Sequence, residues 1–114
     1  MFVKAGKKEA LHLWQQVTSS CVRMKSYDLS MRQLAVLLSV YLEPAPHTVK
    51  NLAERMNISK PAICRALDYL ARSGLLKRVR DEHDRRNVLV QRTVKGSVFL
   101  TEFSELIMYN LGKV

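Results

Sequence analysis

The sequence is poor in aromatic residues and glycine: 7% of its residues are Phe, Trp or Tyr, and only four are glycine. This composition argues against a β-sandwich, whose strands and turns use both types heavily, while the 47% hydrophobic content argues against a disordered chain. A chain of 114 residues can build one core but has no room for a separate catalytic domain. We therefore expect a single, mainly helical domain over residues 1–114.

Cysteine is also scarce, and no long apolar run is present. Cys21 and Cys64 form no CxxC pair and have no histidine cluster nearby, so neither a zinc site nor a disulfide framework is expected. No stretch reaches the roughly 18 apolar residues of a membrane span, and the start MFVKAGKKEA lacks the pattern of a secretory leader. We expect a cytoplasmic protein without membrane contact, metal or cofactor.

Catalytic patterns are missing as well. The sequence offers no Ser/His/Asp set, no glycine-rich phosphate loop and no pair of carboxylates in an apolar setting. We therefore expect a protein that is not an enzyme.

Positive charge, in contrast, is abundant and concentrated. The net charge is +9, and eleven of the 19 lysines and arginines fall between Thr48 and Arg92, against five acids there. Such a localised basic surface favours a polyanionic partner, because neutralising phosphates releases condensed counterions.

Two helices are expected before this basic segment. Ala10, Trp14, Val17, Cys21 and Met24 recur at a 4-3-4-3 spacing, which predicts one apolar stripe on a helix over about residues 7–25 within an N-terminal segment 1–28. Ser30 with Gln33 predicts a capping box that starts a second helix, and Pro44 and Pro46 end it. Both apolar faces are expected in a core or an interface.

The segment TVKNLAERMNISKPAICRALDYLARSGLL, starting at Thr48, predicts a helix-turn-helix. Its apolar spacing suits two short helices that close around a tight turn. Ala53 lies where the helices pack most closely, and Asn57 stands at a turn position that requires a left-handed backbone. Ser59 is the expected cap of the second helix, with Pro61 in its first turn.

The outward face of this second helix is the first candidate DNA-binding site. If Ile63, Ala66, Leu67 and Leu70 face the core, the opposite face carries polar and small residues. Such a helix characteristically enters the major groove. The candidate contacts to phosphates, base edges or thymine methyls are Ser59, Lys60, Pro61, Ala62 and Arg65.

Two β-prone runs, 75–80 and 88–93, flank the charged turn DEHDRR and predict a β-hairpin, the wing of a winged helix over about residues 75–93. Here the sequence resembles the MarR family of bacterial transcription regulators over roughly residues 29–100. The resemblance rests on NLAERMNISKPAICRALDYLARSGLLKR, followed by D-x-x-D-R-R and T-x-x-G, which here are Asp81, Asp84, Arg85, Arg86, Thr93 and Gly96.

The resemblance implies roles for the wing. In this family a wing arginine reaches the DNA minor groove while a neighbouring aspartate orients it, so Asp84 is the orienting acid, and Arg85 and Arg86 are the candidate DNA contacts. The resemblance also implies a DNA-binding region, residues 29–93, between two dimerisation helices. One of these helices is N-terminal, and the other lies in the C-terminal segment 94–114. The family's longer C-terminal helices are not present here, so an effector pocket is doubtful.

Some positions leave alternatives open. Arg92 stands where the family has an aliphatic residue, and it is either a phosphate contact at the base of the wing or a side chain that extends out of the core. Oxidant sensing through Cys64 or Cys21 competes with the simpler view that Cys21 packs and Cys64 is incidental.

The sequence thus predicts a mainly α protein with a small β-hairpin: a winged helix-turn-helix that forms a homodimer and binds a palindromic operator in double-stranded DNA. Its expected function is that of a transcriptional regulator, most simply a repressor. The alternative is a winged-helix module that docks on a larger regulatory or replication protein.

Overall fold

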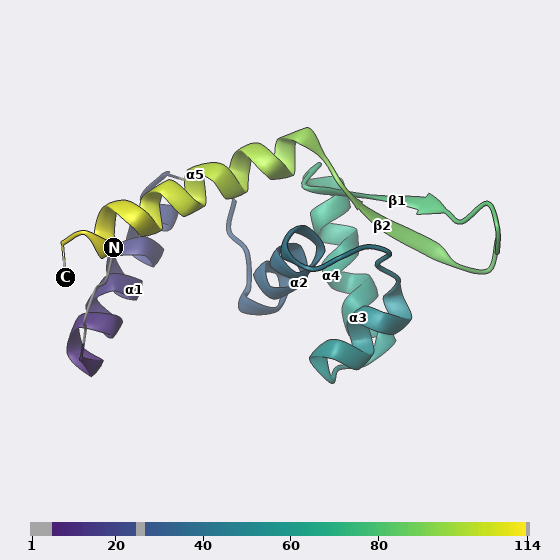
Figure 1. Cartoon of the computed structure of the whole chain (residues 1–114), viewed down its shortest axis with the longest axis horizontal. Coiled ribbons are helices and arrows are strands. Elements are labelled where there is room, and N and C mark those ends of the chain that lie inside the picture. The colour runs from purple at the N-terminus through teal and green to yellow at the C-terminus, as the bar shows by residue number, and fades with distance from the viewer. Residues whose placement is uncertain (1–5, 25–26, 114) are drawn as a thin grey trace. The chain divides into compact units, whose positions relative to one another are not determined.

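The computed structural model describes residues 6–24 and 27–113. These residues form five helices and one two-stranded antiparallel hairpin (Figure 1). The elements are α1 Lys7–Met24, α2 Met31–Leu42, α3 Val49–Met56, α4 Lys60–Arg72, β1 Leu76–Arg80, β2 Val88–Arg92 and α5 Val94–Leu111. The predicted fold class, mainly helical with a β-hairpin, is confirmed; residue 25, the expected last residue of the first helix, lies outside the described residues.

The chain divides into two compact units. One, which we call the lobe, comprises Leu29–Phe99; the other joins the described residues up to Asp28 to those from Leu100 onward. The helix α5 begins in the first unit and ends in the second. Neither α1 nor any other helix of the described residues has the length and apolar character needed to cross a bilayer.

Side-chain caps fix where α2 and α3 begin. Oγ of Ser30 accepts a hydrogen bond from the Gln33 N–H at 3.1 Å, and the Gln33 side chain accepts from the Ser30 N–H at 2.9 Å, which completes the predicted capping box of α2. Thr48 and Asn51 form the same reciprocal pair at the start of α3. Because each cap satisfies donors that have no partner within the helix, these residues set where the helices begin.

Apart from the buried His47, the core of the lobe is aliphatic. Its fully or almost fully buried side chains come from the inward faces of α2, α3 and α4, from the start of β1 and from β2. They are Val36, Leu37, Val40, Leu52, Ile63, Leu67, Leu70, Leu75, Leu76 and Val90. Burial of this face holds α4 in place and leaves its opposite face open.

The T-x-x-G motif has a structural explanation at the start of α5. The Thr93 hydroxyl donates to the Gly74 carbonyl at 2.7 Å and accepts from the Gly96 N–H at 3.0 Å, so Thr93 caps the helix. The Tyr41 hydroxyl lies 2.9 Å from the Thr93 carbonyl oxygen and 3.1 Å from that of Leu75, and it accepts from the Thr93 N–H at 3.0 Å. Gly96 is buried beside this hydroxyl, and only a residue without a Cβ fits there.

In the second unit most apolar side chains remain accessible. Of the predicted stripe on α1, Val17 alone is fully buried, whereas Trp14 and Met24 are exposed. Other large apolar side chains are exposed too, among them Leu11 and Val22 at 72% and Met108 at 70%. These helices therefore present apolar side chains that the described residues of this unit do not cover.

Candidate nucleic-acid interface

The turn between α3 and α4 has the predicted backbone. Asn57 adopts a left-handed conformation with φ 54° and ψ 46°, and the N–H of Ile58 donates to the Ala53 carbonyl at 3.2 Å. Ala53 is buried, as expected for the point of closest approach. Ser59 then caps α4, because its Oγ accepts from the Ala62 N–H at 3.2 Å, and Pro61 occupies the first turn. The helix ends at Arg72, and Gly74, two residues later, has a φ of 78°.

Four of the five candidate contacts on α4 lie on its exposed face. Ser59, Lys60, Pro61 and Arg65 are all exposed, so their side chains are available to a partner. One prediction was wrong: Ala62 was placed on this outward face, but it is only 4% exposed. Ala62 lies one turn before Ala66 on the helix, so the buried face of α4 extends one position further toward its N-terminus than predicted.

The wing is closed by backbone hydrogen bonds beyond the last strand pair, Arg80 with Val88. The Asp81 N–H donates to the Asn87 carbonyl at 3.1 Å, and the Asn87 N–H donates to the Asp84 carbonyl at 2.9 Å. The Asp81 carboxylate also accepts from the His83 N–H at 2.9 Å. In the turn DEHDRR, the two aspartates thus accept hydrogen bonds from the backbone of the turn itself.

Asp84 holds Arg86 through three hydrogen bonds. Its Oδ1 accepts from the Arg86 Nε at 3.0 Å and from the Arg86 backbone N–H at 3.1 Å, and its Oδ2 accepts from Nη2 at 3.2 Å. The Arg86 guanidinium lowers the pKa of the Asp84 carboxyl, with the backbone N–H of Arg86 adding to the effect. The carboxylate in turn raises the pKa of Arg86. Asp84 therefore fixes the orientation of the Arg86 side chain. Because this side chain is 90% exposed, it remains accessible to a partner.

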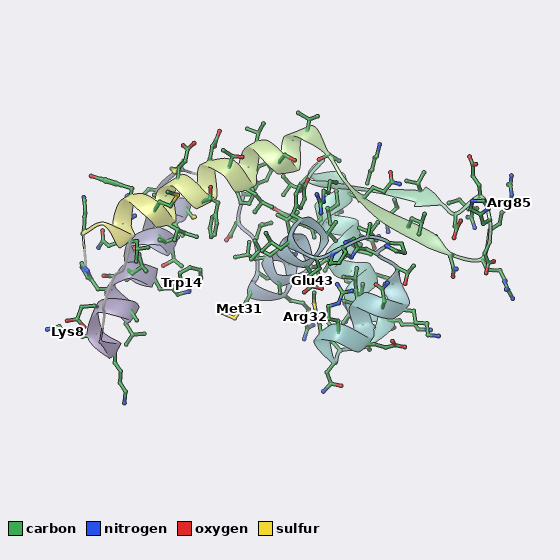
Figure 2. The ribbon with its side chains drawn as sticks, viewed as in Figure 1. Lys8, Trp14, Met31, Arg32, Glu43 and Arg85 are labelled. Carbon is green, nitrogen blue, oxygen red and sulfur yellow. The ribbon has the colours of Figure 1, made fainter. Side chains whose placement is uncertain are left out.

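Arg85 is held differently from Arg86. Its backbone carbonyl accepts a hydrogen bond from Nη1 of Arg80, whereas its side chain has no hydrogen-bond or ion-pair partner among residues 6–24 and 27–113. Figure 2 shows Arg85 at the far end of the hairpin. The Asp84 carboxylate therefore positions Arg86, whereas no described residue holds the side chain of Arg85.

Three further arginines make contacts that fix their side chains, and two of them, Arg78 and Arg80, were not singled out from the sequence. Arg78 of β1 pairs with Asp68 of α4, with Nη1 and Oδ1 2.7 Å apart, and Arg80 binds the wing tip as described. Arg92 donates from Nε to the Val40 carbonyl at 3.1 Å and lies over the Tyr41 ring, 5.7 Å from its centroid. Arg92 thus supplies a donor to a free carbonyl in the last turn of α2 while its side chain stays exposed.

The two cysteines differ in setting. Cys64 is exposed on α4, and burial raises the pKa of the Cys21 thiol, which disfavours the reactive thiolate at that site. Neither cysteine forms a disulfide. In the described part of the chain, no group of three or more His, Cys, Asp or Glu side chains is arranged to hold a metal ion.

Comparisons with known proteins agree with this geometry. The sequence model of the MarR family matches residues 27–87, more than half of the chain. S. aureus MepR, solved in complex with DNA, has the same fold with a TM-score of 0.77 at 19% identity, covering 90% of this chain and 82% of that one. A mutant MarR from E. coli, complexed with operator DNA, gives a TM-score of 0.70 at 24% identity, covering 94% of this chain and 71% of the other.

A third solved structure is more similar in sequence. The transcriptional regulator BldR from Sulfolobus solfataricus is 28% identical, with a TM-score of 0.64, and the match covers 96% of this chain and 84% of that one. The family match spans the helix-turn-helix and the wing tip up to Asn87, the same segment that holds the candidate site residues. The chain belongs to the MarR family.

Proposed function

We propose that this protein is a sequence-specific transcriptional regulator that binds double-stranded DNA as a homodimer in the cytoplasm and most simply acts as a repressor. The observation that carries the proposal is the bond pattern at the wing tip: the Asp84 carboxylate holds the guanidinium of Arg86, which is otherwise exposed. A narrow minor groove concentrates negative potential, and a planar guanidinium held in this way suits it. No catalytic step is part of this function.

In this proposal α4 is the recognition helix, which enters the major groove. Lys60 and Arg65 contact phosphates or guanine, and Ser59 and Pro61 lie at the N-terminal end that approaches base edges. Ala62 is not among the proposed contacts, because its side chain is buried. Arg85 and Arg86 supply the wing contacts, and Asp84 positions Arg86.

The proposed dimer is supported by the exposed apolar side chains of α1 and of the end of α5. Leu11, Val22 and Met108 are each at least 70% exposed, and a second copy of the chain would cover such a surface. We expect sedimentation equilibrium at micromolar concentration to give a dimer, and replacement of Leu11 and Val22 by glutamate to shift the mass toward the monomer.

Met31→Glu is the matched control, because Met31 is 82% exposed but lies at the start of α2, in the lobe. This variant should remain dimeric. A wild-type protein that sediments as a monomer at every concentration would contradict the dimer.

The experiment that tests the function is footprinting on DNA fragments selected from a random library. A two-fold dimer presents two recognition helices, so we expect protection of an inverted repeat with half-sites about 10 bp apart. Equal affinity for selected and random duplex at physiological salt would reject sequence-specific binding and favour the alternative function, a module that docks on another protein.

A further inference from the structure

The wing has little support from the core of the lobe. In β1 only the first residue, Leu76, is buried, and the four residues after it are exposed. In β2 only Val90 is buried. Figure 1 shows the hairpin extending beyond α3 and α4. A two-stranded hairpin is marginally stable alone, so contacts outside the core must fix its direction.

The second strand, β2, is attached through its backbone. The Val90 N–H donates to the His47 carbonyl at 2.8 Å, and Thr48 and Leu89 form an antiparallel β-bridge. Thr48 is also the cap of α3. These contacts tie β2 to the start of the first helix of the helix-turn-helix.

The first strand, β1, is attached through a side chain. Nη1 of Arg78 lies 2.7 Å from Oδ1 of Asp68, a residue on the exposed face of α4. Two residues further along the same strand, and so on the same face of the hairpin, Arg80 donates from Nη1 to the Arg85 carbonyl. Asp68 thus holds Arg78 of β1 at α4, and Arg80 of the same strand holds the turn that carries Arg85 and Arg86.

We propose that Asp68 and Arg78 are positioning residues that fix the wing to the recognition helix, so that Arg86 and the exposed face of α4 engage DNA together. This inference rests on the proposed function and extends it to an acid and an arginine whose roles are indirect. The pair is partly exposed, with side-chain exposures of 56% for Asp68 and 38% for Arg78. Such a pair contributes little to folding stability, so its effect is expected in DNA binding.

Simple electrostatics predicts that the loss of Asp68 tightens DNA binding. Removing a negative charge from a surface that faces phosphates strengthens attraction to DNA, and it would also release Arg78 to bind a phosphate itself. If the pair positions the wing, the loss of Asp68 instead weakens binding, because Arg86 no longer has a fixed place relative to α4. The sign of the change therefore separates the two accounts.

The test compares Asp68→Asn with Glu82→Gln in the full-length protein. Both substitutions remove one acid from the exposed surface, and Glu82 has no hydrogen-bond or ion-pair partner in the described chain. We expect Asp68→Asn to weaken binding to a selected DNA duplex roughly fivefold or more, with an unchanged melting temperature. Glu82→Gln should bind as well as the wild type or slightly more tightly, and Asp68→Glu should recover part of the loss.

A double-mutant cycle connects the pair to the wing. Asp68 and Arg86 share no contact among the described residues, so the effects of independent substitutions should multiply. We expect instead that Arg86→Ala costs clearly less in the Asp68→Asn background than in the wild type. Tighter binding by Asp68→Asn, or effects that simply multiply, would overturn the proposal.

Amide hydrogen exchange without DNA provides a second readout. Asp68→Asn should speed exchange in residues 79–88 of the wing and leave the core of α4 protected. If the wild type proves unable to select a DNA sequence but this exchange change occurs, the proposed function fails while the Asp68–Arg78 attachment stands. Unchanged exchange in the wing would count against the attachment whatever the DNA result.

Discussion

Replacing Gly96 by alanine is expected to lower the free energy of unfolding by about 2–4 kcal/mol. A Cβ at this position would lie 2.0 Å from the Tyr41 hydroxyl and 2.2 Å from the Leu75 carbonyl oxygen, so α5 could keep its place only if the backbone moved. Any such movement breaks the hydrogen bonds that Tyr41 makes with Thr93. Helix propensity alone predicts a gain of about 1 kcal/mol for alanine in a helix, so the sign of the effect is diagnostic.

Urea unfolding of the purified protein measures this change, with Gly112→Ala as the matched control. At Gly112 the nearest atom to an added Cβ is the Tyr109 carbonyl oxygen at 3.6 Å, an ordinary contact, and we expect a change within about 0.5 kcal/mol. Equal stability of both variants would contradict the proposed packing of α5 against Tyr41.

Local features of the fold were predictable from sequence because each depends on neighbouring residues. The capping box of Ser30 and Gln33 and the cap at Ser59 involve residues three apart, and the left-handed turn at Asn57 depends on its own side chain. The expected hairpin runs, 75–80 and 88–93, agree with β1 and β2 to within one residue at each end. Such signals need no knowledge of the tertiary structure.

Features that depend on packing were predicted less well. The burial of Ala62 could not be inferred from periodicity, since the width of a buried stripe depends on what packs against the helix. The pairing of Asp68 with Arg78 joins a helix to a strand, and the bond from Arg92 to Val40 joins residues 52 positions apart. The pattern T-x-x-G was recognised from the sequence, but the reason for its glycine, the nearby Tyr41 hydroxyl, appears only in the fold.

Loss of Asp84 is expected to have the largest effect on DNA affinity apart from loss of the arginines themselves. Arg86→Ala should weaken binding about tenfold or more for most sequences and flatten the dependence of log K on log salt, because a phosphate-directed cation is lost. Asp84→Ala should reproduce much of this loss, since the carboxylate makes two hydrogen bonds to the guanidinium and one to the backbone of Arg86. Changes at Pro61 or Arg65 should instead alter which bases are preferred.

The acidity of Asp84 fixes the conditions for this comparison. Its pKa is lowered by Arg86, so the contribution of the ionised carboxylate is present above the ordinary carboxyl range and is lost only as pH falls through the lowered value. Measurements near neutral pH therefore compare a fully ionised Asp84 with its replacement. Glu82→Ala is the control for removing an acid from the wing, because Glu82 is exposed and has no hydrogen-bond or ion-pair partner in the described chain.

The central claim, that an acid in the wing serves to position an arginine for DNA, is tested most directly by one measurement. The affinity of Asp84→Ala for the selected DNA site and for random duplex is measured across a salt series at neutral pH, with folding checked by thermal melting. We predict a folded variant that binds both DNAs more weakly than the wild type, with a flatter salt dependence. A folded Asp84→Ala that binds more tightly than the wild type would contradict the account, because Asp84 would then act only as a negative charge near DNA.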